Sequence, residues 1–105
     1  RRAPNYARAS PGVVVRPREE HRQVMSFTYV YILQSNADPA RHYTGITDDL
    51  PDRLRRHNAG EVAHSSKYRP WNIRTAIAFP NRERAAAFEK YLKTHSGRVF
   101  ASRHF

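Results

Sequence analysis

The sequence predicts one α+β (mixed α/β) domain, a small three-stranded antiparallel sheet flanked by helices in the order β-β-α-β-α. Three short runs, 27–34, 42–46 and 71–79, are rich in the β-branched and aromatic residues typical of strands. The segments after the second and third runs instead repeat apolar residues at the spacing of a helix. A chain of 105 residues fits one domain with a modest core.

The first predicted strand, residues 27–34, reads FTYVYILQ. Its odd-numbered residues share one face of the strand and its even-numbered residues share the other, and both faces are largely apolar. Such a strand is typical of the centre of a sheet, covered on both sides. Residues 35–41 have the composition of a turn, so we expect residues 42–46 (HYTGI) to pair back as the second strand of a hairpin.

A helix is expected after this hairpin. Thr47, Asp48 or Asp49 can serve as its N-cap, Pro51 is tolerated in its first turn, and Gly60 ends it.

The buried side of this helix is unusual. Leu50 and Leu54 lie four residues apart and mark its apolar stripe, but Arg53 and His57 fall within roughly 60° of them around the helix. We expect both polar residues to turn toward the body of the domain. Buried polar groups need hydrogen-bonding partners, so a polar site is expected there.

The rest of the chain completes the predicted fold. Residues 61–70 (EVAHSSKYRP) predict a basic, polar loop, followed by the strand 71–79. Asn81 is the expected N-cap of the next helix and Gly97 its expected end. Its apolar stripe consists of Ala85, Phe88 and Leu92. We expect residues 98–105 to form a short terminal helix.

Composition limits the function. The chain carries 19 lysines and arginines against 9 acidic residues, a net charge of +10, which favours a polyanionic partner because neutralised phosphates release counterions. It contains no cysteine, which excludes disulfides, a cysteine zinc site and a thiol nucleophile and agrees with a reducing, cytoplasmic setting. No apolar run approaches the roughly 18 residues of a transmembrane helix, so no membrane partner is expected.

The N-terminal segment differs from the remainder. Residues 1–24 hold six arginines, three prolines and little apolar content, so we expect a disordered basic extension. Met25 directly precedes the first strand, and the folded domain is expected to span residues 25–105. Without the extension, 13 basic and 7 acidic residues remain, so the basic character does not depend on it.

Two tyrosine triplets fall on the adjacent strands of the predicted hairpin, YVY at 29–31 and YTG at 43–45. The helix with Arg53 and His57 follows them, and Glu89 lies in the second helix. Together with the stretches YVYILQS, YTGITDDL, RLRRHNAG, KYRPWNI and AFEKYLK, this order resembles the GIY-YIG endonuclease family, especially its small stand-alone members. The likeness covers nearly the whole proposed domain.

The resemblance implies five catalytic residues, Tyr31, Tyr43, Arg53, His57 and Glu89. It implies Tyr43 as the general base, with His57 orienting or relaying and Tyr31 positioning the water or the phosphate. Arg53 can fork onto phosphate oxygens. Glu89 is the expected ligand of one Mg²⁺, or another divalent cation such as Mn²⁺, which takes oxygen ligands and keeps most of its waters. A single carboxylate is a weak site, so we expect metal to bind well only together with nucleic acid.

The triplets also show where this chain departs from the family pattern. Gly45 is the glycine of the second triplet, with a structural role. Tyr29 stands where the first triplet of the family has its glycine, and Ile46 stands where some repair-type members carry a lysine. That lysine's role therefore has no counterpart here.

The function expected from these features is metal-dependent hydrolysis of phosphodiester bonds in DNA, with RNA as a second substrate candidate. Repair, recombination or processing of unusual DNA structures is the expected setting, and a protein partner could supply substrate specificity. Lys67, Arg69 and Lys93 are the candidate nucleic-acid contacts. The alternative is a nucleic-acid-binding module without turnover, in which Glu89 and Lys93 are an ordinary i,i+4 surface pair. Oligomeric state stays open.

Overall fold

The structure is a computed structural model that describes residues 26–105. The predicted disordered extension, residues 1–24, and the predicted start of the domain at residue 25 lie outside the described residues. The elements follow the predicted order, with one 3₁₀ helix added: β1 (Thr28–Ser35), β2 (His42–Thr47), α1 (Leu50–Asn58), η2 (Ala63–Tyr68), β3 (Trp71–Phe79), α2 (Arg82–Leu92) and α3 (His95–His104). None of the helices in this part of the chain has both the length and the apolar character needed to cross a membrane.

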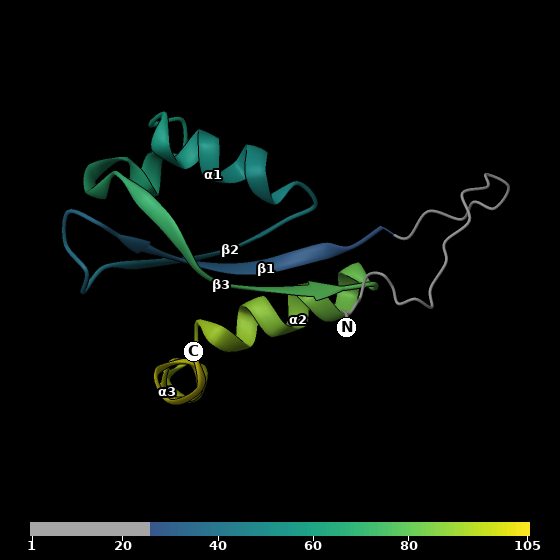
Figure 1. The fold of residues 1–105 in the computed structure, drawn as a ribbon. Coiled ribbons are helices and arrows are strands. Elements are labelled where there is room, and N and C mark those ends of the chain that lie inside the picture. The colour runs from purple at the N-terminus through teal and green to yellow at the C-terminus, as the bar shows by residue number, and fades with distance from the viewer. Residues whose placement is uncertain (1–25) are drawn as a thin grey trace, which may run out of the picture.

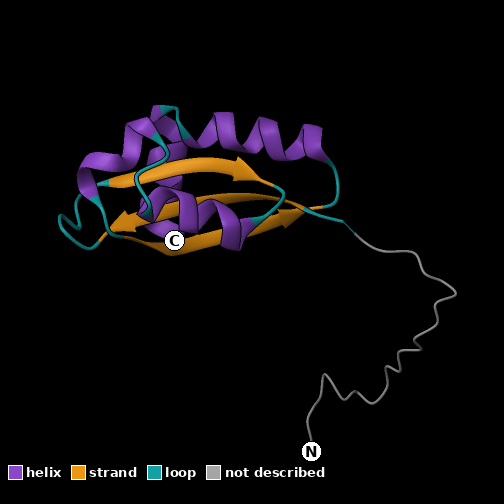
Figure 2. Cartoon of the chain, turned by 90° about the horizontal axis from the view of Figure 1, so that it is seen from above, coloured by secondary structure: helices purple, strands orange, loops and turns teal. Residues whose placement is uncertain are grey.

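The three strands form one antiparallel sheet in the order β2-β1-β3, which confirms that the first strand is central. Tyr31 in β1 stands opposite Gly45 in β2 and opposite Ala76 in β3. The helix α1 lies over one face of the sheet, and α2 and α3 lie over the other (Figure 1). Seen from above, the three strands run side by side between the helices (Figure 2).

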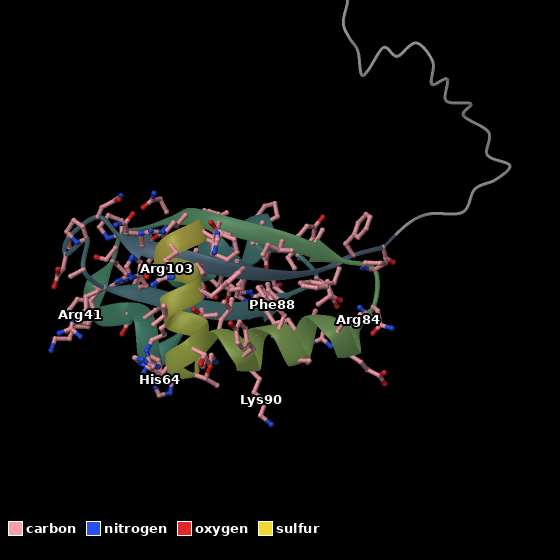
Figure 3. The ribbon with its side chains drawn as sticks, turned by 90° about the horizontal axis from the view of Figure 1, so that it is seen from below. Arg41, His64, Arg84, Phe88, Lys90 and Arg103 are labelled. Carbon is pink, nitrogen blue, oxygen red and sulfur yellow. The ribbon has the colours of Figure 1, made fainter. Side chains whose placement is uncertain are left out.

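The alternating pattern of β1 supplies two separate apolar cores. Val30 and Ile32 pack with Ala85 and Leu92 of α2 on one face of the sheet. Tyr31, Leu33 and Trp71 pack on the opposite face, against side chains of α1 and the second strand. Phe88 of α2 lies between that helix and the sheet, in the first of these cores (Figure 3). The expected stripe of α2 therefore faces the sheet.

The helix ends follow the capping residues expected from the sequence. The Asp49 side chain accepts a hydrogen bond from the Asp52 amide at 3.1 Å, so Asp49 is the N-cap of α1. Gly60 follows the helix with a φ of 79°, the left-handed conformation that favours glycine. Asn81 caps α2 through the Arg84 amide at 3.1 Å.

Two predicted boundaries are wrong. Residues 61–70 do not form an irregular loop, because Ala63–Tyr68 make the 3₁₀ helix η2. The helix α2 ends at Leu92 and not at Gly97, because Thr94 caps a new helix by accepting the Gly97 amide at 3.0 Å. Gly97 lies inside α3, where a Cβ atom would collide with the backbone of Tyr91 and Leu92. Its glycine permits the close approach of two helices and does not end one.

Candidate active site

A buried tyrosine on the central strand forms the base of the site. Tyr31 is only 1% exposed, and its ring crosses the sheet surface toward β2. The register places Gly45 directly beside it, and a Cβ atom at Gly45 would collide with the Tyr31 phenol. Gly45 therefore leaves the space in which the Tyr31 hydroxyl lies, which is a physical reason for the glycine of the second triplet.

The Tyr31 hydroxyl meets a fully buried histidine of α1. Its oxygen lies 3.0 Å from His57 Nε2, and His57 Nδ1 lies 2.6 Å from Ser65 Oγ in η2. His57 and Ser65 are both 0% exposed. Three elements, β1, α1 and η2, thus share one buried hydrogen-bonded chain, tyrosine to histidine to serine.

The direction of the protons in this chain follows from Ser65. The Ser65 hydroxyl donates to the Val62 carbonyl at 3.2 Å, and assigning its one proton there makes Ser65 Oγ the acceptor of the His57 Nδ1–H. His57 Nε2 then carries no proton and accepts the Tyr31 O–H. The carbonyl of Ser65 also accepts the Trp71 indole N–H at 2.8 Å, which fixes η2 against the core. The hydrogen bond from His57 Nδ1–H to Ser65 Oγ holds the imidazole in one tautomer.

Burial and charge set the protonation states. Burial lowers the pKa of the His57 imidazole below its ordinary value, and the charge of Arg53 acts in the same direction. Burial raises the pKa of the Tyr31 hydroxyl, the neighbouring Tyr43 and the charge of Glu89 add to that effect, and the Arg53 guanidinium opposes it. The buried pair is therefore a neutral imidazole and a neutral phenol. Arg53 is the cation that acts on the pKa values of both.

Tyr43 is the more accessible of the two tyrosines. It lies on the edge strand β2 and is half-buried, whereas Tyr31 is covered. Its ring centroid lies 4.5 Å from that of His57 in an edge-on arrangement and 6.3 Å from that of Tyr31. Tyr31 and His57 therefore support the Tyr43 ring from beneath. Of the two tyrosine hydroxyls, that of Tyr43 is the one that a substrate can approach from solvent.

Arg53 lies at the outer edge of the sheet and is half-buried. Its Nη1 donates to the carbonyl of Ile46 in β2 at 3.5 Å, and the same side chain opposes the rise that burial causes in the pKa of Tyr31. Both polar residues of α1 therefore turn inward, as their positions beside Leu50 and Leu54 predict. Their partners are a tyrosine, a serine and a backbone carbonyl, and Ser65 is the one that the sequence does not reveal.

Glu89 comes from the opposite side of the sheet. It lies on α2, which packs against β1 and β2 on the face away from α1 (Figure 1). Its side chain is 19% exposed, and its Oε2 lies 2.6 Å from Lys93 Nζ. Its charge nevertheless contributes to raising the pKa of Tyr31. The structure therefore brings Tyr31, Tyr43, Arg53 and His57 together, and it places Glu89 near them but paired with Lys93.

Comparison with known proteins identifies a family for this chain. Residues 27–102 match the sequence profile described as "GIY-YIG catalytic domain". The chain belongs to the GIY-YIG family. The resemblance and the fold class expected from the sequence are both confirmed, and the family implies a nuclease domain.

The relatives of this GIY-YIG domain fall into two groups. Over 73 residues it is 40% identical to the structure-specific endonuclease subunit SLX1 of Scheffersomyces stipitis, a match that covers 63% of this chain and 22% of that protein. The SLX1 of Schizosaccharomyces pombe is 40% identical over 70 residues, 61% of this chain and 26% of that protein. UPF0213 protein BH0048 of Halalkalibacterium halodurans is 35% identical over 71 residues, which cover 67% of this chain and 73% of that protein. The matches span between 14% and 27% of the length of the SLX1 relatives.

The GIY-YIG site has few groups that could hold a metal ion. Within residues 26–105, no three His, Cys, Asp or Glu side chains lie together as a metal-binding group. Glu89 offers a carboxylate, and Mg²⁺ accepts oxygen ligands while keeping several waters, so one carboxylate next to a phosphate fits that ion. Because Lys93 occupies one oxygen of Glu89, the metal has to compete with an ammonium group for this ligand.

The predicted nucleic-acid contacts of the GIY-YIG domain lie in different places. Lys67 and Arg69 are exposed residues at and just after the end of η2, where Lys67 Nζ lies 5.6 Å from the centroid of the Tyr68 ring. Arg69 Nε donates to the Ser66 carbonyl at 2.9 Å. Lys93 lies at the C-terminal end of α2, on the opposite side of the sheet from η2. The three cations therefore do not form one cluster.

We expect the buried His57 to make the stability of this GIY-YIG domain pH-dependent. Since its folded pKa lies below the unfolded value of about 6.5, the unfolded state binds more protons below that pH. The free energy of unfolding should therefore fall as the pH drops below about 6.5. The fall should stop once the pH is below the folded pKa of His57. Urea unfolding over this range measures the slope.

Two variants identify the residue responsible for the slope. His57→Gln should flatten it, even though this variant is less stable at every pH. His64→Gln is the matched control, because it makes the same chemical change at an exposed histidine. A slope that disappears in His64→Gln and persists in His57→Gln would contradict the assignment.

Proposed function

We propose that this GIY-YIG domain is a Mg²⁺-dependent endonuclease that hydrolyses phosphodiester bonds in branched or otherwise unusual DNA structures, as part of repair or recombination. The observation that supports it is that Arg53 and Tyr43 lie beside the Tyr31–His57 pair at one edge of the sheet. The charge of Glu89 also acts on the Tyr31 hydroxyl. The name of the SLX1 relatives, structure-specific endonuclease subunit, favours a branched substrate.

The proposed roles follow from exposure and charge. Arg53 is permanently charged and offers a planar fork of donors to the phosphoryl oxygens, where negative charge grows in the transition state. Tyr43, the accessible tyrosine, gives its hydroxyl proton to solvent and then, as the phenolate, takes the proton of the attacking water. His57 and Tyr31 are buried, so they hold the Tyr43 ring in position and do not touch the substrate. Glu89 would hold a Mg²⁺ ion, which supplies stabilisation of the leaving 3′-oxygen when bound.

A second candidate function rests on the ion pair of Glu89. Lys93 Nζ lies 2.6 Å from Glu89 Oε2, so the Glu89 carboxylate is neutralised in the free protein. A domain that binds nucleic acid without turnover does not need this carboxylate for a metal ion, so the ion pair fits that function as well. The basic charge of the chain would serve either function. The word "subunit" in the name of the SLX1 relatives also supports a protein partner that supplies specificity.

Labelled substrates distinguish the two functions. Single-stranded, duplex and branched DNA, and RNA of the same sequences, are incubated with the protein in Mg²⁺, Mn²⁺ or EDTA. We expect cuts in branched DNA with either metal ion and none in EDTA. Glu89→Gln should remove the cuts, whereas Glu83→Gln, an exposed glutamate in the first turn of the same helix, should keep them. Binding to these substrates without metal-dependent cuts would instead establish the binding module.

A further inference from the structure

A cavity of about 440 Å³ lies on the face of the sheet that α2 and α3 cover. Its floor is apolar and includes Ile32 of the central strand, Leu92 of α2 and Ala101 of α3. Its volume lies within the range of pockets that hold small ligands. None of these floor residues belongs to the Tyr31–His57–Ser65 chain, which lies on the opposite face.

The rim of this cavity is cationic. Arg74, Lys93 and Arg98 line it, together with His42. Arg74 is held by two contacts, donating to His42 Nε2 at 3.2 Å and to the Phe105 carbonyl at 2.9 Å. Arg98 donates to the Lys93 carbonyl at 2.8 Å. Both arginines are therefore held in position by these contacts, and the partner of Arg98 is a neutral carbonyl.

Acidic side chains do not pair with these two arginines, Arg74 and Arg98, in the part of the chain that the structure describes. Positioned guanidinium groups above an apolar floor match a ligand with one anionic end and one flat, largely apolar end. A nucleotide has this combination, with a phosphate for the arginines and a base for the floor.

We propose that this cavity binds one unpaired nucleotide of the DNA substrate, which rests on the proposed endonuclease function. A base stacked inside a duplex cannot enter a cavity, so the nucleotide must come from a single-stranded segment or be extruded. The cations hold its phosphate, and the base lies against the apolar floor. The proposal thus gives a reason for selecting substrates with a junction between duplex and single strand.

Two residues connect the cavity with the candidate active site. Tyr43 lines the cavity and also packs on His57 at 4.5 Å. Lys93 lines the cavity and also forms the ion pair with Glu89. An unpaired nucleotide in the cavity therefore lies across the edge strand β2 from the Tyr43 ring, which packs with His57 on the other face of the sheet. Its phosphate competes with Glu89 for the ammonium group of Lys93, so occupation of the cavity favours a carboxylate that is available to a metal ion.

Binding measured in EDTA tests the proposal without any need for cleavage. The probes are a short single-stranded oligodeoxynucleotide and a blunt duplex of the same sequence, each labelled for fluorescence anisotropy. Arg74→Gln/Arg98→Gln should weaken single-strand binding about tenfold or more and leave duplex binding nearly unchanged. The salt slope for the single strand should fall by about 0.7, since both arginines hold the same phosphate and each lost phosphate contact contributes about 0.7.

The matched control removes two positive charges elsewhere. Arg84→Gln/Lys90→Gln changes exposed residues of α2, of which Lys90 points away from the sheet and Arg84 lies near the far end of the helix (Figure 3). It should affect single strand and duplex equally and weakly. Equal losses in the two double variants, or equal losses on single strand and duplex in the cavity variant, would overturn the proposal.

A second variant tests the cavity itself without changing charge. Ser102 is exposed and lines the cavity, so Ser102→Phe fills it from the surface with little effect on the core. This variant should lose the preference for single strands, and a retained preference would overturn the proposal. Calorimetry compares thymidine monophosphate with inorganic phosphate as free ligands. Tighter binding of the nucleotide is expected, and equal affinity would show that the base is not bound.

Discussion

Replacing Tyr43 by phenylalanine should abolish DNA cleavage and leave substrate binding nearly intact. The ring of Tyr43 packs edge-on against His57 at 4.5 Å, and phenylalanine keeps that contact. The variant therefore removes only the hydroxyl, the group proposed to take the proton of the attacking water. General-base catalysis by a positioned side chain is worth about 10²–10⁴ in rate, so a loss of that size is expected. Single-turnover cleavage of branched DNA measures the rate, and anisotropy in EDTA measures binding.

Tyr31→Phe is the matched comparison, because it makes the same chemical change at the buried tyrosine. It leaves His57 Nε2 without its partner at 3.0 Å, and an unsatisfied buried polar group costs about 1–3 kcal/mol. We therefore expect Tyr31→Phe to lower stability, and Tyr43→Phe to lower activity alone. If Tyr43→Phe cleaves at a near-normal rate while His57→Ala does not, the assignment is reversed and the imidazole is the base.

The fold could be predicted from the sequence because its signals are local. The alternating run at 27–34 needs both faces covered, and the structure covers both with separate cores. Asp49 and Asn81 cap their helices through amides within three residues, so the capping signal lies in the sequence itself. Gly97 misleads because a glycine after a helix and a glycine at a close helix contact look the same in a sequence.

The site could be predicted less completely because its contacts are tertiary. Ser65 lies in a polar stretch, and only the packing of η2 against α1 shows that it is buried and bonded to His57. Helical periodicity places Glu89 on α2, but it does not say which face of the sheet α2 covers. The structure puts Glu89 on the face opposite α1, so the candidate site spans an edge of the sheet and does not fill one face.

Replacing Arg53 by lysine should reduce cleavage about 10²–10³-fold, the effect of losing one preorganised donor to a developing oxyanion. Lysine keeps the positive charge but lacks the planar fork of donors. The guanidinium of Arg53 donates to the Ile46 carbonyl at 3.5 Å and its charge acts on the Tyr31 hydroxyl, so it already faces the site before substrate arrives. A flexible ammonium group cannot serve these partners and two phosphoryl oxygens together. Cleavage rate and urea unfolding are measured on the same preparation.

Arg56→Lys is the matched control on the same helix. Arg56 is exposed and pairs with Asp52 at 2.8 Å, and such surface pairs contribute little to stability. We expect this variant to cleave and unfold like the parent protein, while Arg53→Lys unfolds normally and cleaves slowly. Near-normal cleavage by Arg53→Lys would mean that a point charge at the edge of β2 is enough. The planar fork of the guanidinium would then have no catalytic role, and the half-buried arginine beside the leucines of α1 would serve the fold instead.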